Sequence, residues 1–544
     1  MSDPKDRGSA DARDRRTADP KDRRSAEAKD GRPAPKDRRA AAPKERRTPA
    51  PKERRSRILR GDLPTEPMPM MDLLRRTPYR HARIPEAAAE DTATRNAVEL
   101  AVRVGELMLR CGAGAPQVEG AVAAVAAAGG VDVDDLDITM QSLLVQAHSS
   151  DGRTHTVLRV VRRTRYDYGR LVAVHRLVAA LVAGDVTPDE AAEQLRAIKR
   201  HPRNYPVWAV SVASAMLASA VAVMIGASLL AATVTIVVVL GVAGIGQLLG
   251  RIDLPEFYVN AINSFVATMS AGAFFAAGST GLIDITGTDF AYIVAGGIVA
   301  MLPGRTMASA IEDVLFGYPL TGAGRLLGVS LSLTGLVIGI AGGLSMMLAI
   351  TEVLATDFVP PSVLDLRVTQ APIVPGLIGA LVVGLAAAVT VQSRRMLVLP
   401  TGLLTVAGAA VAALLTRGAG IGIITATGLA AVAIGVVGRV VAQRLHAPSL
   451  VLVVPASFGL LPGLTIFRGL YELVASGSDP GLLSIQAGIT TLLGAGAVLL
   501  AIATGTVFGE ILASPFDRRF RGESVRSASA EAAGAADDGS GHDR

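Results

Sequence analysis

The chain has 544 residues, half of them hydrophobic, and its mean hydropathy of +0.41 is too high for an ordinary soluble protein. Its single cysteine, Cys111, excludes an intramolecular disulfide, and no Cys/His cluster has the spacing of a zinc site. The net charge of +6 is unevenly distributed, because residues 1–60 carry 21 Lys and Arg against 11 Asp and Glu. We therefore expect a membrane protein with a basic N-terminal segment and no metal or other cofactor.

Residues 1–90 form a low-complexity segment in which the unit Pro-Lys-Asp/Glu-Arg recurs. This segment has almost nothing apolar to bury, so we expect a disordered tail. No aromatic side chains interleave with its basic residues to stack on bases, which argues against nucleic-acid binding. The tail is expected either to have no role or to be loosely attracted to anionic lipid. No apolar stretch typical of a signal peptide precedes residue 90, so the tail should remain in the cytosol.

Residues 91–203 have a globular composition and predict a small cytosolic α+β domain. Strands are expected over 142–148 and 154–161, around a turn at Ser150-Asp151-Gly152, and the last helix should begin at the N-cap Thr187. Two histidines in this hairpin are weak evidence for a metal site, and no nucleophile elbow or phosphate loop is present, so we expect no enzyme. Helices are expected over 94–110, 117–128, 171–183 and 187–199.

About ten apolar segments that follow reach the roughly 20 residues needed to cross a bilayer, or nearly so. They predict a polytopic α-helical membrane protein with a first five-helix repeat over 205–355 and a second over 370–515. A disordered cytosolic tail is expected over 516–544. The segments lie near 207–226, 228–249, 258–280, 289–303, 323–350, 371–391, 396–416, 419–441, 449–467 and 482–512.

Arginine placement predicts that both termini are cytosolic, because alternate loops collect the cations as the positive-inside rule requires. Ten spans built from a repeat of five make the second half run opposite to the first, which is an inverted repeat. Glycines at every fourth position, Gly335, Gly339 and Gly343, and the shorter pair Gly435 and Gly438, indicate close helix packing. The expected inner loops contain Arg251, Arg305, Arg325, Arg394, Arg395, Arg439 and Arg444.

One interruption occurs in both halves, as Leu302-Pro303-Gly304 and as Leu461-Pro462-Gly463. Proline removes a helical N–H and glycine lowers the cost of leaving the helix, so both segments predict broken helices, the first toward the cytosol and the second toward the outside. Matched broken helices in two halves are typical of a secondary transporter's binding site. Aligning the two prolines also aligns Thr306 with Thr465 and Asp313 with Glu472.

Charged side chains after each interruption are the candidate transport residues, because charges within spans are costly and usually face a cavity. These are Glu312 and Asp313 in the first half and Arg468 and Glu472 in the second, with Asp313 and Glu472 as candidate proton-coupling carboxylates. The alternative places all four on interfacial amphipathic connectors.

Neutral polar side chains inside the apolar spans, and backbone groups at the interruptions, offer further binding capacity. The amides of Asn260 and Asn263 either bind a small zwitterion or bridge helices. Half-helix N-termini at the breaks would offer free N–H groups to a substrate carboxylate.

The chain resembles the threonine/serine exporter family over residues 92–515. The likeness lies in residues 105–113 with Gln117-Val118-Glu119, in Tyr205-Pro206-Val207-Trp208, in Leu302-Pro303-Gly304 with Asp313, Gly317, Gly322 and Arg325, and in residues 447–463. It implies a secondary-active exporter, an antiporter that moves threonine and serine against protons across the bacterial inner membrane. Ser309 stands where many members should have a more strongly polar residue, so the substrate stays open.

Three other functions stay open from the residues. An exporter of small dicarboxylates would need more cationic cavity residues than Arg305, Arg325 and Arg468. A channel would not need matched broken helices, and a membrane-anchored hydrolase would need a catalytic set in residues 92–200. The expected partners are the substrate, protons and the lipid bilayer. Association with another copy of the chain is left open.

Overall fold

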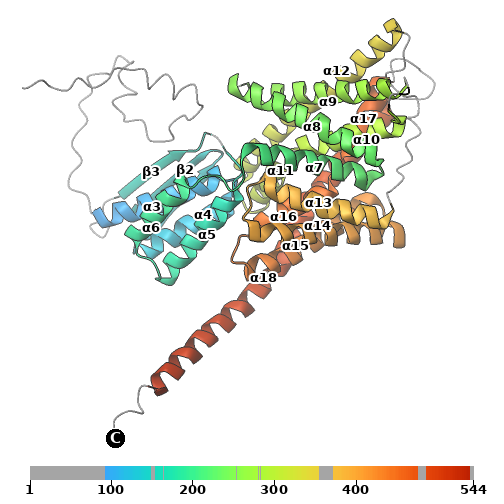
Figure 1. The fold of residues 1–544 in the computed structure, drawn as a ribbon. Coiled ribbons are helices and arrows are strands. Elements are labelled where there is room, and N and C mark those ends of the chain that lie inside the picture. The colour runs from blue at the N-terminus through green and yellow to red at the C-terminus, as the bar shows by residue number, and fades with distance from the viewer. Residues whose placement is uncertain are drawn as a thin grey trace, which may run out of the picture. The chain divides into compact units, whose positions relative to one another are not determined.

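The computed structural model describes residues 92–538 except for 149–153, 163, 253, 280, 282, 355–371 and 476–484. The expected N-terminal tail, the turn Ser150-Asp151-Gly152 and residues 539–544 therefore lie outside the described residues. Helices and strands carry the labels of Figure 1, in which the first described helix is α3.

Residues 92–200, called the α+β region below, form a three-stranded antiparallel sheet and four helices. Strand β2 is central and buries alternate residues, Leu143, Val145 and Ala147, which are fully excluded from solvent. Gly105 lets α3 approach the sheet, because a Cβ there would lie 2.6 Å from the Leu143 side chain. The elements are α3 (Thr92–Arg110), α4 (Ala115–Ala128), β1 (Val133–Thr139), β2 (Ser142–His148), β3 (Thr154–Val160), α5 (Tyr168–Ala183) and α6 (Pro188–Arg200).

The two predicted strands are present as β2 and β3, but β1 was not predicted. Its sequence, Val-Asp-Asp-Leu-Asp-Ile-Thr, is rich in aspartate, which is depleted in strands. Because β1 lies at the edge of the sheet, its carboxylates can face solvent, and charge on an edge strand opposes pairing with other chains.

Side-chain caps determine where the last two helices of the α+β region begin. Thr187 is the N-cap of α6, as predicted, and forms a reciprocal capping box with Glu190, whose Oε2 accepts the Thr187 N–H at 2.9 Å. Helix α5 begins three residues earlier than predicted, because Asp167 accepts the backbone N–H of Arg170 at 3.0 Å.

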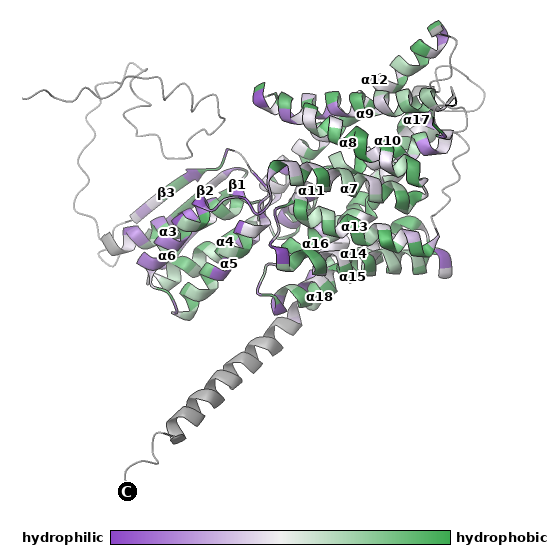
Figure 2. Cartoon of the chain, viewed as in Figure 1, coloured by the Kyte–Doolittle hydropathy of each residue, from purple (hydrophilic) through white to green (hydrophobic). Residues whose placement is uncertain are grey.

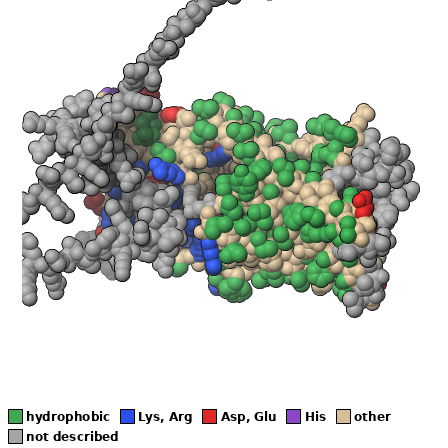
Figure 3. All heavy atoms as spheres, turned by 90° about the horizontal axis from the view of Figure 1, so that it is seen from above, with side chains coloured by type: hydrophobic (Ala, Val, Ile, Leu, Met, Phe, Trp, Pro, Cys, Tyr) green, Lys and Arg blue, Asp and Glu red, His purple; other side chains and the backbone are tan. Residues whose placement is uncertain are grey.

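Among the described residues, eight helices are long and apolar enough to cross a membrane, and two bent helix pairs raise the total to ten. The chain is therefore a polytopic α-helical membrane protein. The parts of these helices that Figure 2 colours are predominantly hydrophobic, and in Figure 3 hydrophobic side chains are spread over much of the surface that grey atoms do not cover. The eight are α7 (Val207–Ile225), α8 (Leu229–Leu249), α9 (Glu256–Ser279), α12 (Pro319–Leu354), α13 (Ile373–Thr390), α14 (Arg395–Ala413), α15 (Ile423–Arg444) and α18 (Ile485–Asp538).

The predicted glycine stripe packs α12 against α9. A Cβ on Gly335 or Gly339 would strike the backbone oxygen of Phe257 or Ala261, and one on Gly343 would lie 2.8 Å from the Thr268 Cβ. Helices α15 and α18 also meet through glycines, with Gly435 facing the backbone of α18. Small residues thus allow backbone contact at both interfaces.

Helix α18 continues to Asp538, whereas a disordered tail was predicted from residue 516. The stretch from residue 527 onward is rich in alanine, which has the highest helix propensity. The apolar stretch of α18 suitable for spanning ends at Pro515.

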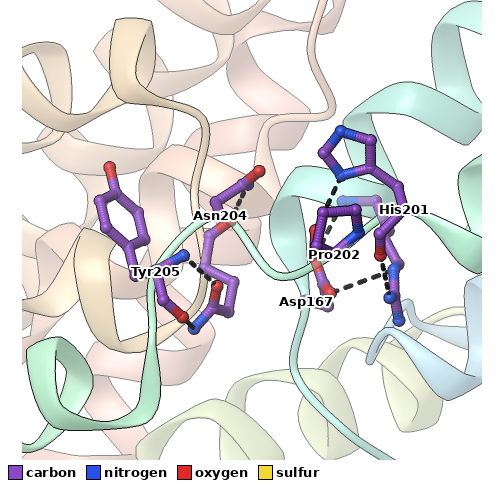
Figure 4. Close-up of polar contacts among 7 residues, drawn as sticks. Asp167, His201, Pro202, Asn204 and Tyr205 are labelled. Carbon is purple, nitrogen blue, oxygen red and sulfur yellow. Dashed lines mark hydrogen bonds and ion pairs between the residues drawn. The ribbon is translucent and has the colours of Figure 1, made fainter.

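Hydrogen bonds of Asn204 and Tyr205 with Gln392 join the connection between α6 and α7 to the turn between α13 and α14 (Figure 4). The Gln392 side chain accepts the Tyr205 N–H at 2.9 Å and donates to the Tyr205 carbonyl oxygen at 3.1 Å. Asn204 donates to the Gln392 carbonyl oxygen at 2.7 Å. The start of the first membrane half is therefore bound to the second half.

Candidate functional site

Both predicted broken helices are present. Helix α10 (Gly287–Met301) and α11 (Gly304–Leu315) meet at an angle of 48°, and α16 (Leu450–Ala456) with the 3-10 helix η4 (Ser457–Leu460) meets α17 (Gly463–Ala475) at 47°. The residue before each proline is extended, with φ −63° and ψ 133° at Leu302 and φ −66° and ψ 136° at Leu461. This is the conformation that a following proline imposes. We call Leu302-Pro303-Gly304 the first break and Leu461-Pro462-Gly463 the second break.

The two breaks lie against each other. A Cβ on Gly304 would lie 3.5 Å from the Phe458 ring and 3.7 Å from Leu461, and one on Gly463 would lie 2.8 Å from the Ala295 carbonyl oxygen. The two broken helices therefore contact each other at their breaks, and the expectation that the breaks lie toward opposite faces of the membrane stays a prediction.

Asp313 is fully buried and joins the broken helix to the α+β region. Its Oδ1 accepts the N–H of Ala115, the first residue of α4, at 2.8 Å. Its Oδ2 lies 2.9 Å from Nη1 of Arg325, close enough for an ion pair although not aligned as a hydrogen bond. Arg325 also donates to the Ala113 carbonyl oxygen at 3.3 Å. A helix N-terminus and a guanidinium together stabilise the charged carboxylate.

The neighbours of Asp313 on α11 bind the α+β region as well. Glu312 accepts a hydrogen bond from Gln117 Nε2 at 3.1 Å, and the Thr306 hydroxyl lies 2.5 Å from the hydroxyl of Tyr166. The Arg305 guanidinium stacks over the Tyr166 ring at 4.8 Å. The α+β region therefore contacts α11 both near its start and near its end.

Ser309, the position that departs from the expected family pattern, is buried at 2 % exposure on α11. Its hydroxyl has no hydrogen-bond partner among the residues that the structure describes. A buried hydroxyl without a partner costs free energy, so this position can take a hydrogen bond from a ligand or a water molecule.

Glu472 is also buried, at 6 % exposure, and two of its partners come from α17 and α18. Its carboxylate accepts from Arg468 at 2.9 Å, one turn earlier on α17, and from the Thr491 hydroxyl of α18 at 2.8 Å. Thr465 lies half-buried in the first turn of α17. The aligned acids Asp313 and Glu472 are therefore both buried, yet only Asp313 contacts the α+β region in the interactions described.

The predicted asparagines lie apart from these acids, on α9. Asn260 and Asn263 are half-buried, and Asn263 faces Gly246 of α8, where a Cβ would lie 3.0 Å from Nδ2. The Asn263 Oδ1 is buried without a hydrogen-bond partner in the described residues of the chain. No described contact joins either asparagine to Asp313 or Glu472, so the structure does not gather all the predicted residues into one site.

A cleft of about 1750 Å³ opens beside Glu312, between helices α4 and α5 of the α+β region and helices α11, α15, α16 and α18. Glu510 of α18 lies in it and accepts a hydrogen bond from the Ser449 hydroxyl at 2.7 Å, and Arg439 of α15 donates to the Glu510 carbonyl oxygen at 3.0 Å. His175 of α5 also lines the cleft, and burial lowers its pKa, which favours a neutral imidazole.

Sequence reasoning missed Glu510, although a carboxylate inside a predicted span is itself a signal of function. It also missed Arg439 and Ser449, which were assigned to a loop and to the start of a span. Their relation to Glu510 depends on helix packing that the sequence does not display.

Two sequence profiles match the chain. A family described as "Putative threonine/serine exporter" matches residues 99–347, and one described as "Threonine/Serine exporter, ThrE" matches residues 376–512.

Two relatives cover most of the chain. It is 32 % identical over 439 residues to a "Probable threonine/serine exporter" of Mycobacterium tuberculosis, with 78 % of each chain covered. It is 27 % identical over 418 residues to the "Threonine/serine exporter" of Corynebacterium glutamicum, with 76 % of this chain and 82 % of the relative covered. No solved structure matches the chain.

Proposed function

This chain belongs to the threonine/serine exporter family, and we propose that it exports threonine and serine across the bacterial inner membrane, driven by the proton gradient. The observation that carries the proposal is the crossing of two broken helices, each followed by a buried carboxylate. Half-helix ends inside a membrane protein leave backbone groups free for substrate and coupling ions.

Asp313 is the carboxylate best placed to couple protonation to movement. When charged, it holds α11 to Arg325 and to the N-terminus of α4. Protonation removes the charge that both partners attract, so it would loosen α11 from the α+β region. Glu472, at the aligned position after the second break, would exchange its proton with a different side of the membrane.

The neighbour relations of the helices support the proposed inverted repeat. In the first half α9 packs with α12 and α11 with α12, and in the second half α15 packs with α18 and α17 with α18. Across the halves, α10 contacts α17 while α11 contacts α16, and α12 contacts α17 while α11 contacts α18. Each contact has its counterpart, as expected for two halves related by a pseudo-two-fold axis.

Contacts of the α+β region support the proposed cytosolic side. It binds Thr321 at the start of α12, Gln392 in the turn before α14, and the carbonyl oxygen of His446 after α15. All three positions fall at loops that the arginine distribution assigns to the cytosol.

Export of a dicarboxylate is less well supported. Arg325 and Arg468, two of the three cations considered for it, already pair with Asp313 and Glu472. Arg305 stacks on Tyr166 and lies near Phe458. A dianion would have to displace a carboxylate to reach either paired arginine.

Efflux of radiolabelled threonine and serine from dipeptide-loaded cells, with and without the gene, tests the transported substrate. Asp313→Asn and Glu472→Gln should each abolish gradient-driven efflux at a normal membrane level. Asp132→Asn and Glu352→Gln, which change exposed carboxylates, should transport like the wild type. Wild-type efflux in both buried-site variants would refute proton coupling through these residues.

A further inference from the structure

We propose that the cleft between the α+β region and helices α11, α15, α16 and α18 captures the amino acid before export, with Glu510 binding its ammonium group. This inference rests on the proposed function and names the place where substrate is first held. The α+β region then forms a wall of the binding site.

Side chains from α15 and from the connection before α16 meet Glu510 of α18. Ser449, which precedes α16, donates its hydroxyl to the Glu510 carboxylate at 2.7 Å, and Arg439 of α15 is held next to it by the Glu510 carbonyl oxygen at 3.0 Å. A carboxylate, a guanidinium and a hydroxyl therefore lie together in a cleft whose walls also include apolar side chains such as Val453 and Val507. Threonine and serine present the complementary groups, which are an ammonium, a carboxylate and a hydroxyl.

Two amide oxygens in the same cleft lack donors. Oε1 of Gln117, on the wall formed by the α+β region, and Oε1 of Gln443, on α15, are each buried without a hydrogen-bond partner among the residues that the structure describes. Buried acceptors without donors are costly and mark places where a ligand or water supplies them. An ammonium brings three donors and a hydroxyl brings one, so a hydroxy amino acid suits this set.

The cleft reaches Glu312, the residue next to the proposed coupling carboxylate. Glu312 lines the cleft and accepts from Gln117, and the next residue, Asp313, carries the ion pair with Arg325. An ammonium that binds between Glu510 and Glu312 would compete for the Gln117–Glu312 hydrogen bond. Binding in the cleft would thus weaken the hold of α4 on α11 at its acidic end.

Substrate protection of a cysteine in the cleft tests the inference in the full-length protein. With Cys111→Ser as background, Ala121→Cys places a thiol on the cleft wall of α4, and Gln194→Cys places one on the exposed face of α6 as a control. Serine and threonine should slow maleimide labelling at position 121 and leave position 194 unchanged. Glycerate, in which a hydroxyl replaces the amino group of serine, should not protect.

Glu510→Gln should raise the serine concentration needed for half-protection by roughly tenfold or more, since a charge-assisted hydrogen bond is lost. Labelling at position 121 that ignores serine and threonine, in a chain that still exports them, would overturn the cleft proposal and leave the proposed function intact. Equal protection by glycerate, or an unchanged half-protection in Glu510→Gln, would overturn the role of Glu510. If wild-type cells exported neither amino acid, both proposals would fail.

Discussion

Arg325→Met should expose how strongly the fold depends on the Asp313 ion pair. The substitution keeps most of the side-chain volume and removes the guanidinium that lies 2.9 Å from the carboxylate. Asp313 would remain fully buried with only the Ala115 N–H at 2.8 Å as a described partner. Removing one member of a buried pair costs roughly 3–5 kcal/mol, and the 20 % exposure of Arg325 places this case at about 3 kcal/mol.

A double-mutant cycle separates the pair from the packing. Asp313→Asn in the Arg325→Met background removes the uncompensated charge, so the double variant should be more stable than Arg325→Met alone by about 1–2 kcal/mol. Unfolding in mixed micelles, followed by circular dichroism as the denaturing detergent increases, gives the four free energies.

Arg251→Met, at an exposed position, is the matched control and should lie within about 0.5 kcal/mol of the wild type. Equal stability of Arg325→Met and this control would contradict a stabilising role of the ion pair. Additive effects of Arg325→Met and Asp313→Asn would also contradict it.

Three further outcomes are expected. Reporter fusions at Gly287 should report the outside and fusions at Gln392 the inside, and the opposite pattern at both would reverse the proposed topology. Because burial raises the pKa of Cys111 to about 12, its thiolate fraction and its iodoacetamide labelling rate should rise about tenfold per pH unit from about pH 7 to 10, and a plateau near pH 9 would contradict this. Gly339→Leu should destabilise the α9–α12 interface by about 1–3 kcal/mol or more in the same detergent titration, because its Cβ would strike Ala261, whereas Gly328→Leu, in open space on α12, should not.

Features that depend on local covalent chemistry were predictable from the sequence. Pro303 and Pro462 each remove a helical N–H and are each followed by glycine, so both breaks could be predicted from the repeated Pro-Gly pair. The glycine stripe of α12 likewise follows from spacing, since a period of four places Gly335 and Gly339 on one face.

Features that depend on distant partners were not predictable. Asp313 was selected as a coupling acid, but its contact with Ala115 joins residues 198 positions apart, and no local pattern indicates that pairing. The hydrogen bond between Ser449 and Glu510 was not predicted for the same reason, because the two residues are distant in the sequence. Strand β1 was missed for another reason, because edge position outweighed the low strand propensity of its aspartates.

The crossed breaks have a consequence for chain continuity. The two halves of the membrane domain pack against each other at the breaks, where Gly463 lies against Ala295. They are also joined by a hydrogen bond between Gln392 of one half and Tyr205 of the other. A cut within residues 355–371 would sever the covalent link and leave these contacts untouched. Two separately expressed halves should therefore reassemble into a working complex. Either half alone would expose its broken helix to lipid.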